Sequence, residues 1–270
     1  MTQPNTLPAN DRRSPSEGSG GHFHSVSLSG GKDSTYLLLR MIELGMPIDA
    51  VISADTGMEF PEMYDHLAKL DDHLHSERGI HITTLRHPKW FEWLMFDEPK
   101  QKPSALERRA RLGVPPYGNG WPGMRVRWCT GQLKTHLISK EVNRLKAEKN
   151  ALHYVGIAAD EAWRCKGEQY PLVEWGVTEA EALQGCYDRG FDFGGLYEIY
   201  HRCSCWRCPF QRISELRKLR THHPELWARL RQMDDKARAQ FGPGPLGQFK
   251  KDWSVARLEE RFAREGVLTE

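Results

Sequence analysis

The sequence predicts an α/β fold in which a doubly wound, mostly parallel sheet is followed by a C-terminal helical extension. Short apolar runs near residues 26–28, 49–54 and 80–85 alternate with segments of helical periodicity, and a fourth strand-like run follows at 152–157. Strands that alternate with helices pair in parallel through right-handed crossovers. We therefore expect the strands to form one sheet with helices on both faces.

The first two crossovers have clear helix signals. The helix after the first strand stops near Gly45-Met46-Pro47, because glycine and proline both disfavour its continuation. After the second strand, apolar residues recur at steps of three and four, which predicts an amphipathic helix. These residues are Met63, Leu67, Leu70 and Leu74.

The regular pattern fails between Pro88 and Arg127, where we expect a long irregular connection that is functional or disordered. Its basic run, Lys100 to Arg111, suits a lid over nucleic acid or another anion, or equally a solvated helix face. Helical periodicity resumes around residues 133–145 and dominates the charged sequence beyond Pro209.

Composition bounds the function classes. The 270 residues include 38 basic and 36 acidic ones, so the net charge of +2 favours no nucleic-acid partner for the chain as a whole, and any basic site is local. No apolar run approaches the roughly 18 residues of a membrane span. Six cysteines without an export signal indicate a reducing compartment, so we expect a soluble cytoplasmic protein.

Three regions are expected along the chain. Residues 1–21 are rich in proline, serine, asparagine and glycine and are predicted to be a disordered tail. Residues 22–212 hold the alternating strands and helices, and residues 213–270 are expected to form the helical extension.

The stretch Ser29-Gly30-Gly31-Lys32-Asp33-Ser34 lies where the first strand meets the first helix. Glycines let backbone N–H groups approach an oxyanion, the helix N-terminus adds a positive dipole end, and Lys32 adds a full charge. The spacing is neither the Walker type nor G-x-G-x-x-G. An anionic nucleotide is the expected ligand, and the alternative is a plain Gly-Gly turn with a solvated Lys-Asp pair.

Two further loops should face the same crevice, because ligands of doubly wound sheets bind at the carboxyl ends of the strands. These loops are Asp55-Thr56-Gly57-Met58-Glu59-Phe60-Pro61-Glu62 and Gly156-Ile157-Ala158-Ala159-Asp160-Glu161-Ala162-Trp163-Arg164.

Together these motifs resemble a known family. SGGKDST resembles the PP-loop of the ATP pyrophosphatase, or adenine nucleotide alpha hydrolase-like, superfamily. The ordered set, with Arg127-Trp128-Cys129-Thr130-Gly131-Gln132-Leu133-Lys134 and Tyr170 to Trp175, resembles its phosphoadenosine phosphosulfate (PAPS) reductase family over about residues 24–212.

The resemblance implies a role for each matching residue. The phosphates of ATP or a PAPS-like nucleotide would be held by Ser29, Gly30, Gly31, Lys32, Asp33 and Ser34, and Asp33 would help to place Mg²⁺. Asp55, Gly57 and Gly156 would lie at the nucleotide. The anionic end of the substrate would meet Arg125, Arg127, Lys134 and Arg164, and the catalytic set would be Lys32, Asp33 and Arg164.

Two departures from the family favour one branch. Thioredoxin-dependent reductases carry a nucleophilic cysteine in a Glu-Cys-Gly-type motif near the C-terminus, whereas the last cysteine here is Cys208. A single Cys129 stands where adenylyl-sulfate reductases have a Cys-Cys pair. The chain is therefore more similar to the branch that includes the DNA-phosphorothioation PP-loop protein.

That branch implies cleavage of ATP to AMP and pyrophosphate to activate an acceptor for sulfur transfer or a related modification. A sulfur-donor protein and nucleic acid are then conceivable partners. The alternatives are a true sulfonucleotide reductase and a nucleotide-sensing or nucleic-acid-binding subunit without turnover.

The cysteines form one notable pattern. Cys203, Cys205 and Cys208 have C-x-C-x-x-C spacing, and Cys129 lies on a loop of the same crevice. Four thiolates suit a [4Fe–4S] cluster or a structural Zn²⁺, and free or redox thiols are the remaining possibility. Cys165 and Cys186 lack such spacing and are expected to be buried structural thiols.

Overall fold

The computed structural model describes residues 21–267 except 125 and 204, and the side chains of 266 and 267 are not described. The tail predicted for residues 1–21 lies outside this part, apart from Gly21, and so does the predicted anion-binding residue Arg125. None of the described helices is long and apolar enough to cross a bilayer.

Four parallel strands form the sheet: β1 (Phe23–Ser27), β2 (Ala50–Asp55), β3 (Ile82–Arg86) and β4 (Ala151–Val155). Their order is β3-β2-β1-β4, with Val26 of β1 paired to Val51 of β2 and to Tyr154 of β4. This arrangement confirms the predicted fold class. The strand order reverses between β1 and β4, so the carboxyl ends of these two strands flank the position where such sheets bind ligands.

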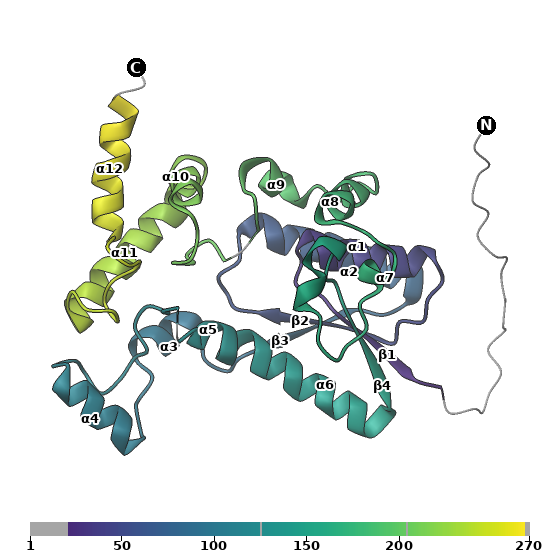
Figure 1. The fold of residues 1–270 in the computed structure, drawn as a ribbon, viewed down its shortest axis with the longest axis horizontal. Helices are drawn as coiled ribbons and strands as arrows, with labels where there is room; N and C mark the ends of the chain where they lie inside the picture. Colours follow the sequence, from purple (N-terminus) through teal and green to yellow (C-terminus); the bar gives the residue numbers. More distant parts are fainter. Residues whose placement is uncertain (1–20, 125, 204, 268–270) are drawn as a thin grey trace.

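Helices cover both faces of the sheet (Figure 1). α1 (Lys32–Glu43) and α2 (Pro61–Arg78) lie on one face, and α6 (His136–Lys149) crosses the other. In α2 the predicted apolar stripe is buried at Met63, Leu70 and Leu74, while Leu67 is partly buried.

The prediction of an irregular connection over residues 88–127 is wrong in part, because two helices interrupt it: α3 (Phe91–Phe96) and α4 (Pro103–Arg111). Four of the six α3 residues are buried, so the helix has no polar face to produce a periodic pattern. In α4 only Arg109 is buried, and its guanidinium donates to the backbone carbonyls of Pro115, Tyr117 and Gly118.

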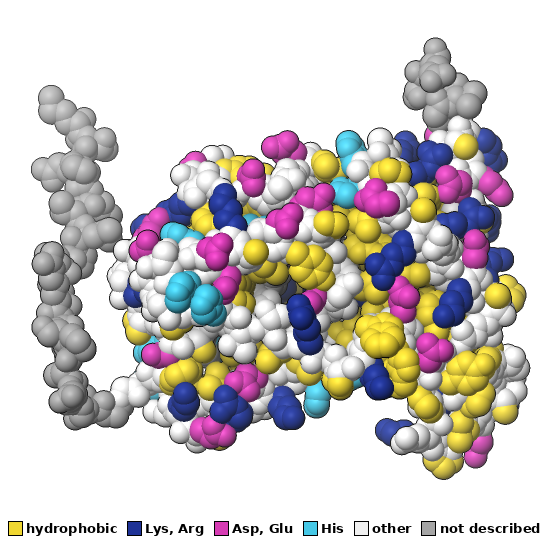
Figure 2. Space-filling model, turned by 180° about the vertical axis from the view of Figure 1, so that it is seen from behind, with side chains coloured by type: hydrophobic (Ala, Val, Ile, Leu, Met, Phe, Trp, Pro, Cys, Tyr) yellow, Lys and Arg dark blue, Asp and Glu magenta, His cyan; other side chains and the backbone are white. Residues whose placement is uncertain are grey.

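The α4 residues other than Arg109 are exposed or half-buried, as both alternatives for the basic run require. Apolar side chains are also exposed there, as Leu112 and Met124 are 53% and 72% accessible. Figure 2 shows hydrophobic side chains and Lys or Arg side chains mixed at this corner of the molecule, at lower right.

Short elements frame the crevice. They are α5 (Trp128–Thr130), which continues through the π-helical turn η1 (Gly131–Thr135) into α6, then η2 (Ala159–Arg164), α7 (Pro171–Glu174), α8 (Glu179–Tyr187), η3 (Phe193–Gly195) and α9 (Leu196–Ile199).

The C-terminal extension consists of α10 (Ile213–His222), α11 (Pro224–Phe241) and α12 (Val255–Val267). One continuous apolar core joins it to the sheet domain, from Val26 of β1 to Phe262 of α12. The buried carboxylate of Asp234 accepts hydrogen bonds from the Trp121 indole and from the backbone N–H groups of Phe249 and Val255. It thereby ties α11 to the connection before α5. The boundary expected at residue 213 stays a prediction.

His66 predicts a pH-dependent stability. The ring is 4% exposed, hydrogen-bonded to the Thr35 hydroxyl and packed on Phe193, and burial lowers its pKa to about 4. Below the ordinary histidine pKa of about 6.5 the unfolded chain takes up a proton that the folded chain refuses. Acidification from about pH 6.5 to about pH 4 should therefore cost on the order of 3 kcal/mol of unfolding free energy.

Urea unfolding at several pH values tests this origin of the pH dependence. His66→Gln keeps an amide that can bond Thr35 but does not titrate, so the acid-side slope should flatten in this variant. An equal slope in the parent protein and in the variant would assign the effect to other groups.

Candidate functional site

The PP-loop lies between β1 and α1, with Gly31 as the residue that precedes the first turn of the helix. The Ser34 hydroxyl accepts from the Ser29 N–H at 3.1 Å, which closes the loop on itself. Gly30 has φ +79°, and a side chain there would meet the Met63 sulfur at 2.8 Å. The loop therefore requires glycine at this position and presents a helix N-terminus to the crevice.

Gly156, at the end of β4, is in direct contact with this loop. A Cβ atom at Gly156 would lie 2.7 Å from both the N and the Cα of Ser34 and 2.8 Å from the carbonyl carbon of Asp33. The absence of a side chain therefore allows the β4 end to support the PP-loop backbone. This contact brings together the loops after β1 and β4, as the sequence predicts.

The third loop is held by Asp55. Its carboxylate accepts from the Gly57 N–H at 2.7 Å and from the Tyr64 hydroxyl at 2.9 Å, and it pairs with Arg86 at 2.9 Å. Gly57 has φ +71°, the left-handed conformation that favours glycine. Asp55 and Gly57 therefore determine the conformation of the turn after β2.

Three carboxylates gather beside the PP-loop: each of Asp33, Glu161 and Glu179 has an oxygen within 4.8 Å of the others. Their sequence positions are far apart, and the fold brings together the starts of α1, η2 and α8. The Asp33 Oδ1 atom is buried without a hydrogen-bond partner in the described part of the chain. Burial raises the pKa of Asp33 to about 6. A buried carboxylate oxygen without a hydrogen bond, among three acids, fits Mg²⁺, which prefers oxygen ligands.

Cations balance this acidic group. The Lys32 ammonium lies 3.0 Å from Glu179 and 3.7 Å from Asp33. Glu161 pairs with Arg164 and, at 2.7 Å, with Arg202. The Lys32 N–H also donates to the Tyr197 hydroxyl at 3.0 Å. A phosphate bound at the loop would compete with Glu179 for Lys32 and with Tyr197 for this amide.

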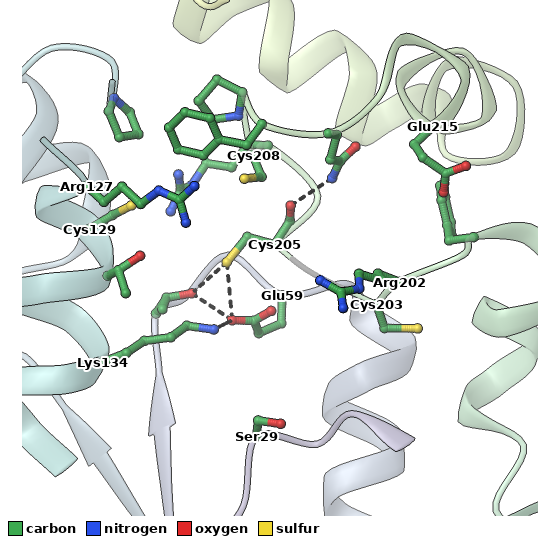
Figure 3. Close-up of a pocket in the computed structure, with 18 of the residues that line it drawn as sticks. Ser29, Glu59, Arg127, Cys129, Lys134, Arg202, Cys203, Cys205, Cys208 and Glu215 are labelled. Carbon is green, nitrogen blue, oxygen red and sulfur yellow. Dashed lines mark hydrogen bonds and ion pairs between the residues drawn. The ribbon is translucent and has the colours of Figure 1, made fainter. Parts of the chain in front are cut away.

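A cavity of about 690 Å³ adjoins the PP-loop, and Ser29 of that loop is among its lining residues. All four predicted cysteines line it, together with two of the predicted anion-binding residues, Arg127 and Lys134 (Figure 3). Lys134 pairs with Glu59 at 2.9 Å, and the Cys205 thiol donates to the same carboxylate at 3.4 Å. The exposed guanidinium of Arg127 lies 4.6 Å from the centre of the Phe210 ring.

The four cysteines do not form one compact set. Figure 3 shows the Cys203 sulfur directed away from those of Cys129, Cys205 and Cys208. Burial raises the pKa of Cys203 to about 12, and Tyr197 and Lys32, which contact each other at the PP-loop, oppose this shift. Among the described residues, the acidic group above is the only triple of His, Cys, Asp or Glu ligand atoms within 4.8 Å. No three of the described sulfur atoms therefore all lie within 4.8 Å of one another.

Arg207 lies in the middle of the cysteine motif and is 2% exposed. Its Cζ lies 3.1 Å from the centre of the Phe91 ring, and its Nε and Nη2 atoms have no hydrogen-bond partner among the described residues. Burial lowers the pKa of Arg207, and the thiols of Cys205, Cys129 and Cys208 oppose that shift. Two unsatisfied nitrogens on a buried cation fit an anionic group beside these thiols, such as a metal–thiolate centre.

The remaining cysteines differ from each other. Cys186 is buried, as expected, with its thiol 3.5 Å from the Lys32 carbonyl oxygen. Cys165 is half-buried, so the expectation of a buried thiol is wrong there.

Sequence reasoning missed Glu161, Glu179, Tyr197 and Arg207 as site residues. Glu161 lies within the motif GIAADEAWR, which the sequence already assigns to the crevice, so this motif could have identified it. Glu179 is an acid in the first turn of a helix, which is an ordinary stabilising feature and marks no site. The others depend on side-chain directions that only the fold reveals.

The contact at Gly156 leads to a direct test. Gly156→Ala should destabilise the protein by about 1–3 kcal/mol and weaken nucleotide binding, because the new methyl group displaces the PP-loop backbone. Gly131→Ala is the matched control, since a Cβ at Gly131 meets nothing within 4 Å and its φ is −60°. Chemical unfolding and nucleotide titration of both variants measure the effects. Equal behaviour of the two variants would refute a supporting role for Gly156.

Comparisons with known proteins agree with the fold of the first part of the chain. Residues 24–106 match a family model described as the phosphoadenosine phosphosulfate reductase domain. An uncharacterized protein of Methanocaldococcus jannaschii is 27% identical over 225 residues, which cover 75% of this chain. The chain spans 39% of the length of that relative.

A solved structure, the U34-tRNA thiolase NcsA from Methanococcus maripaludis with its [4Fe-4S] cluster, aligns with 14% identity and a TM-score of 0.36. The alignment covers 91% of this chain and 73% of that chain. The likeness to the DNA-phosphorothioation branch stays a prediction. Residues 24–106 are thus similar in sequence to a phosphoadenosine phosphosulfate reductase domain.

Proposed function

We propose that this chain is an enzyme that cleaves ATP to AMP and pyrophosphate to activate an acceptor for sulfur transfer or a related modification. One observation carries the proposal: the PP-loop and the cysteine-lined cavity are continuous, because Ser29 of the loop lines that cavity. An activated group formed at the loop would therefore lie next to the thiols.

Charge on the phosphates would be stabilised by the helix N-terminus and by Lys32. Lys32 is held by Glu179 in the free protein, so phosphate binding exchanges one anionic partner for another. Arg164, whose side chain is 44% exposed, is positioned on η2 beside Glu161 and would neutralise the leaving or acceptor group. Asp33, Glu161 and Glu179 would hold Mg²⁺, which supplies charge neutralisation between phosphate oxygens.

The acceptor would enter through the cysteine-lined cavity. Arg127 and Lys134 line it and suit an anionic acceptor, such as nucleic acid, or an acidic sulfur-donor protein. A cluster or metal at the thiols would supply sulfur or redox chemistry. Zn²⁺ fits less well, because Zn–S bonds of about 2.3 Å require sulfur atoms about 3.8 Å apart, and no three of the described cysteine sulfurs all lie within 4.8 Å of one another.

The proposal favours ATP cleavage over sulfonucleotide reduction for a physical reason. A reductase needs a thiolate nucleophile at the sulfate end of its nucleotide. Of the four cysteines that line the cavity, Cys203 is the one whose thiol is influenced by Lys32, and burial raises its pKa to about 12. Such a thiol stays protonated near neutral pH and attacks poorly.

Pyrophosphate release from ATP is the primary test. Lys32→Met should lower it about 100-fold or more, because the charge that stabilises the transferring phosphate oxygens is lost. Arg40→Met is the control, since Arg40 lies in the last turn of the same helix and pairs at the surface with Glu43. Sulfite release from labelled PAPS with thioredoxin, without pyrophosphate release from ATP, would overturn the proposal in favour of a reductase.

The Lys32–Glu179 pair gives a second prediction. Glu179→Gln removes the carboxylate that competes for Lys32 and should strengthen ATP binding without divalent cation by about fivefold. The same change removes a proposed metal ligand, so added Mg²⁺ should improve binding less than in the parent. Calorimetric titrations with chelator and with Mg²⁺ measure both effects, and Glu174→Gln, an exposed change on α7, serves as control. Unchanged affinity in both conditions would contradict the exchange.

A further inference from the structure

The side chain of Arg207 is the least satisfied charge in the cysteine-lined cavity. It is 2% exposed, and neither its Nε nor its Nη2 donates a hydrogen bond within the described part of the chain. Contact with the Phe91 ring supplies a cation–π attraction but accepts no N–H bond. A buried cation left in this condition destabilises the folded protein unless an anion joins it.

Among the described residues, Glu59 is the carboxylate that acts on Arg207, and it forms no ion pair with the guanidinium. Glu59 also lines the cavity, but its Oε1 already accepts from Lys134, from the Thr56 hydroxyl and from the Cys205 thiol. The other groups that oppose the pKa shift of Arg207 are the thiols of Cys205, Cys129 and Cys208, which are weak acceptors while protonated. They become thiolates when they bind a metal, so metal binding would create the missing negative charge beside the guanidinium.

Three thiols line the same cavity as Arg207. Cys205 precedes Arg207 by two residues, Cys208 follows it directly, and Cys129 comes from α5. Cys203 is directed away from them (Figure 3). Since no three ligand atoms of the cysteines lie within 4.8 Å, the arrangement has room for a group wider than a single tetrahedral metal ion.

We propose that Arg207 is the positioning residue of an iron–sulfur cluster held by Cys129, Cys205 and Cys208, and that it compensates the charge of the cluster and donates N–H bonds to its sulfur atoms. Cys203 is not a ligand of this cluster. The inference rests on the proposed function only in assuming that the thiols hold a metal centre, and it is independent of what the PP-loop does.

The proposal has a thermodynamic signature that a structural arginine would not produce. In the metal-free protein, Arg207→Met replaces an unpaired buried charge with a flexible apolar side chain of similar length and should leave stability unchanged or raise it. In the cluster-loaded protein the same change removes hydrogen bonds to sulfur and should lower stability. The sign of the effect thus reverses with the cluster.

The experiment uses the full-length protein, purified anaerobically and reconstituted with iron and sulfide. Iron and sulfide per chain, visible absorption and the rate of iron loss to a chelator are measured for the parent and for the Arg207→Met, Arg207→Lys and Cys203→Ser variants. Arg212→Met is the matched control, because Arg212 lines the same cavity but is exposed. Thermal midpoints are recorded with and without the cluster.

Arg207→Met should lose iron about 10- to 100-fold faster than the parent, with partial rescue in Arg207→Lys. Cys203→Ser and Arg212→Met should retain iron as the parent does. Arg207→Met with parental iron retention, or with a lower midpoint in the metal-free state, would overturn the role of Arg207. Loss of iron in Cys203→Ser would overturn the three-cysteine assignment.

The outcome is separable from that of the proposed ATP chemistry. A parent protein that takes up no iron but releases pyrophosphate in a Lys32-dependent manner would overturn this inference and leave the proposed ATP cleavage standing. A cluster whose retention depends on Arg207, in a protein that releases no pyrophosphate from ATP, would support this inference and overturn the proposed ATP cleavage.

Discussion

The close approach of β4 to the N-terminus of α1 is the constraint on which the site depends. Because Gly156 has no Cβ atom, its backbone can contact the backbone of the PP-loop directly. The carboxyl ends of β1 and β4 therefore meet where the strand order reverses. A parallel sheet places loops at this edge by its connectivity. The contact between Gly156 and Ser34 fixes the position of the PP-loop relative to η2. It thereby keeps a carboxylate oxygen of Asp33 within 4.8 Å of one of Glu161, close enough for both to bind one cation.

Arg202 links the two halves of the site. It lines the cysteine cavity, and its guanidinium also pairs with Glu161 at 2.7 Å and with Glu179 at 3.5 Å. Any ligand that draws these acids away from Arg202 therefore alters the charge at the edge of the cavity. Because Cys203 follows Arg202 in the chain, a change at the phosphates has a short physical route to the thiols.

The sequence was sufficient for the sheet and for the loops at its carboxyl ends, because both are encoded locally. Alternating apolar runs and the glycines of SGGKDST are sufficient to locate all four strands, β1 to β4, and the PP-loop. The α3 helix escaped because it is short and buried on most sides, so it has no amphipathic period. Spacing alone likewise grouped four cysteines, whereas side-chain direction separates Cys203 from the other three.

The PP-loop and the cysteine cavity each contain a buried charged side chain that lacks hydrogen bonds. This side chain is an acid at the PP-loop and a base in the cavity. Within the described part of the chain, Asp33 Oδ1 at the PP-loop and two nitrogens of Arg207 in the cysteine cavity are buried without a hydrogen-bond partner. Asp33 has the Lys32 ammonium, 3.7 Å away, to balance it. Burial of polar atoms without hydrogen bonds costs stability, so packing does not explain either group. A cation beside Asp33 and an anionic metal–sulfur group beside Arg207 would each remove the deficit. The free energy recovered would then appear as affinity for those ligands, because the folded protein already bears the cost of holding the charges in place.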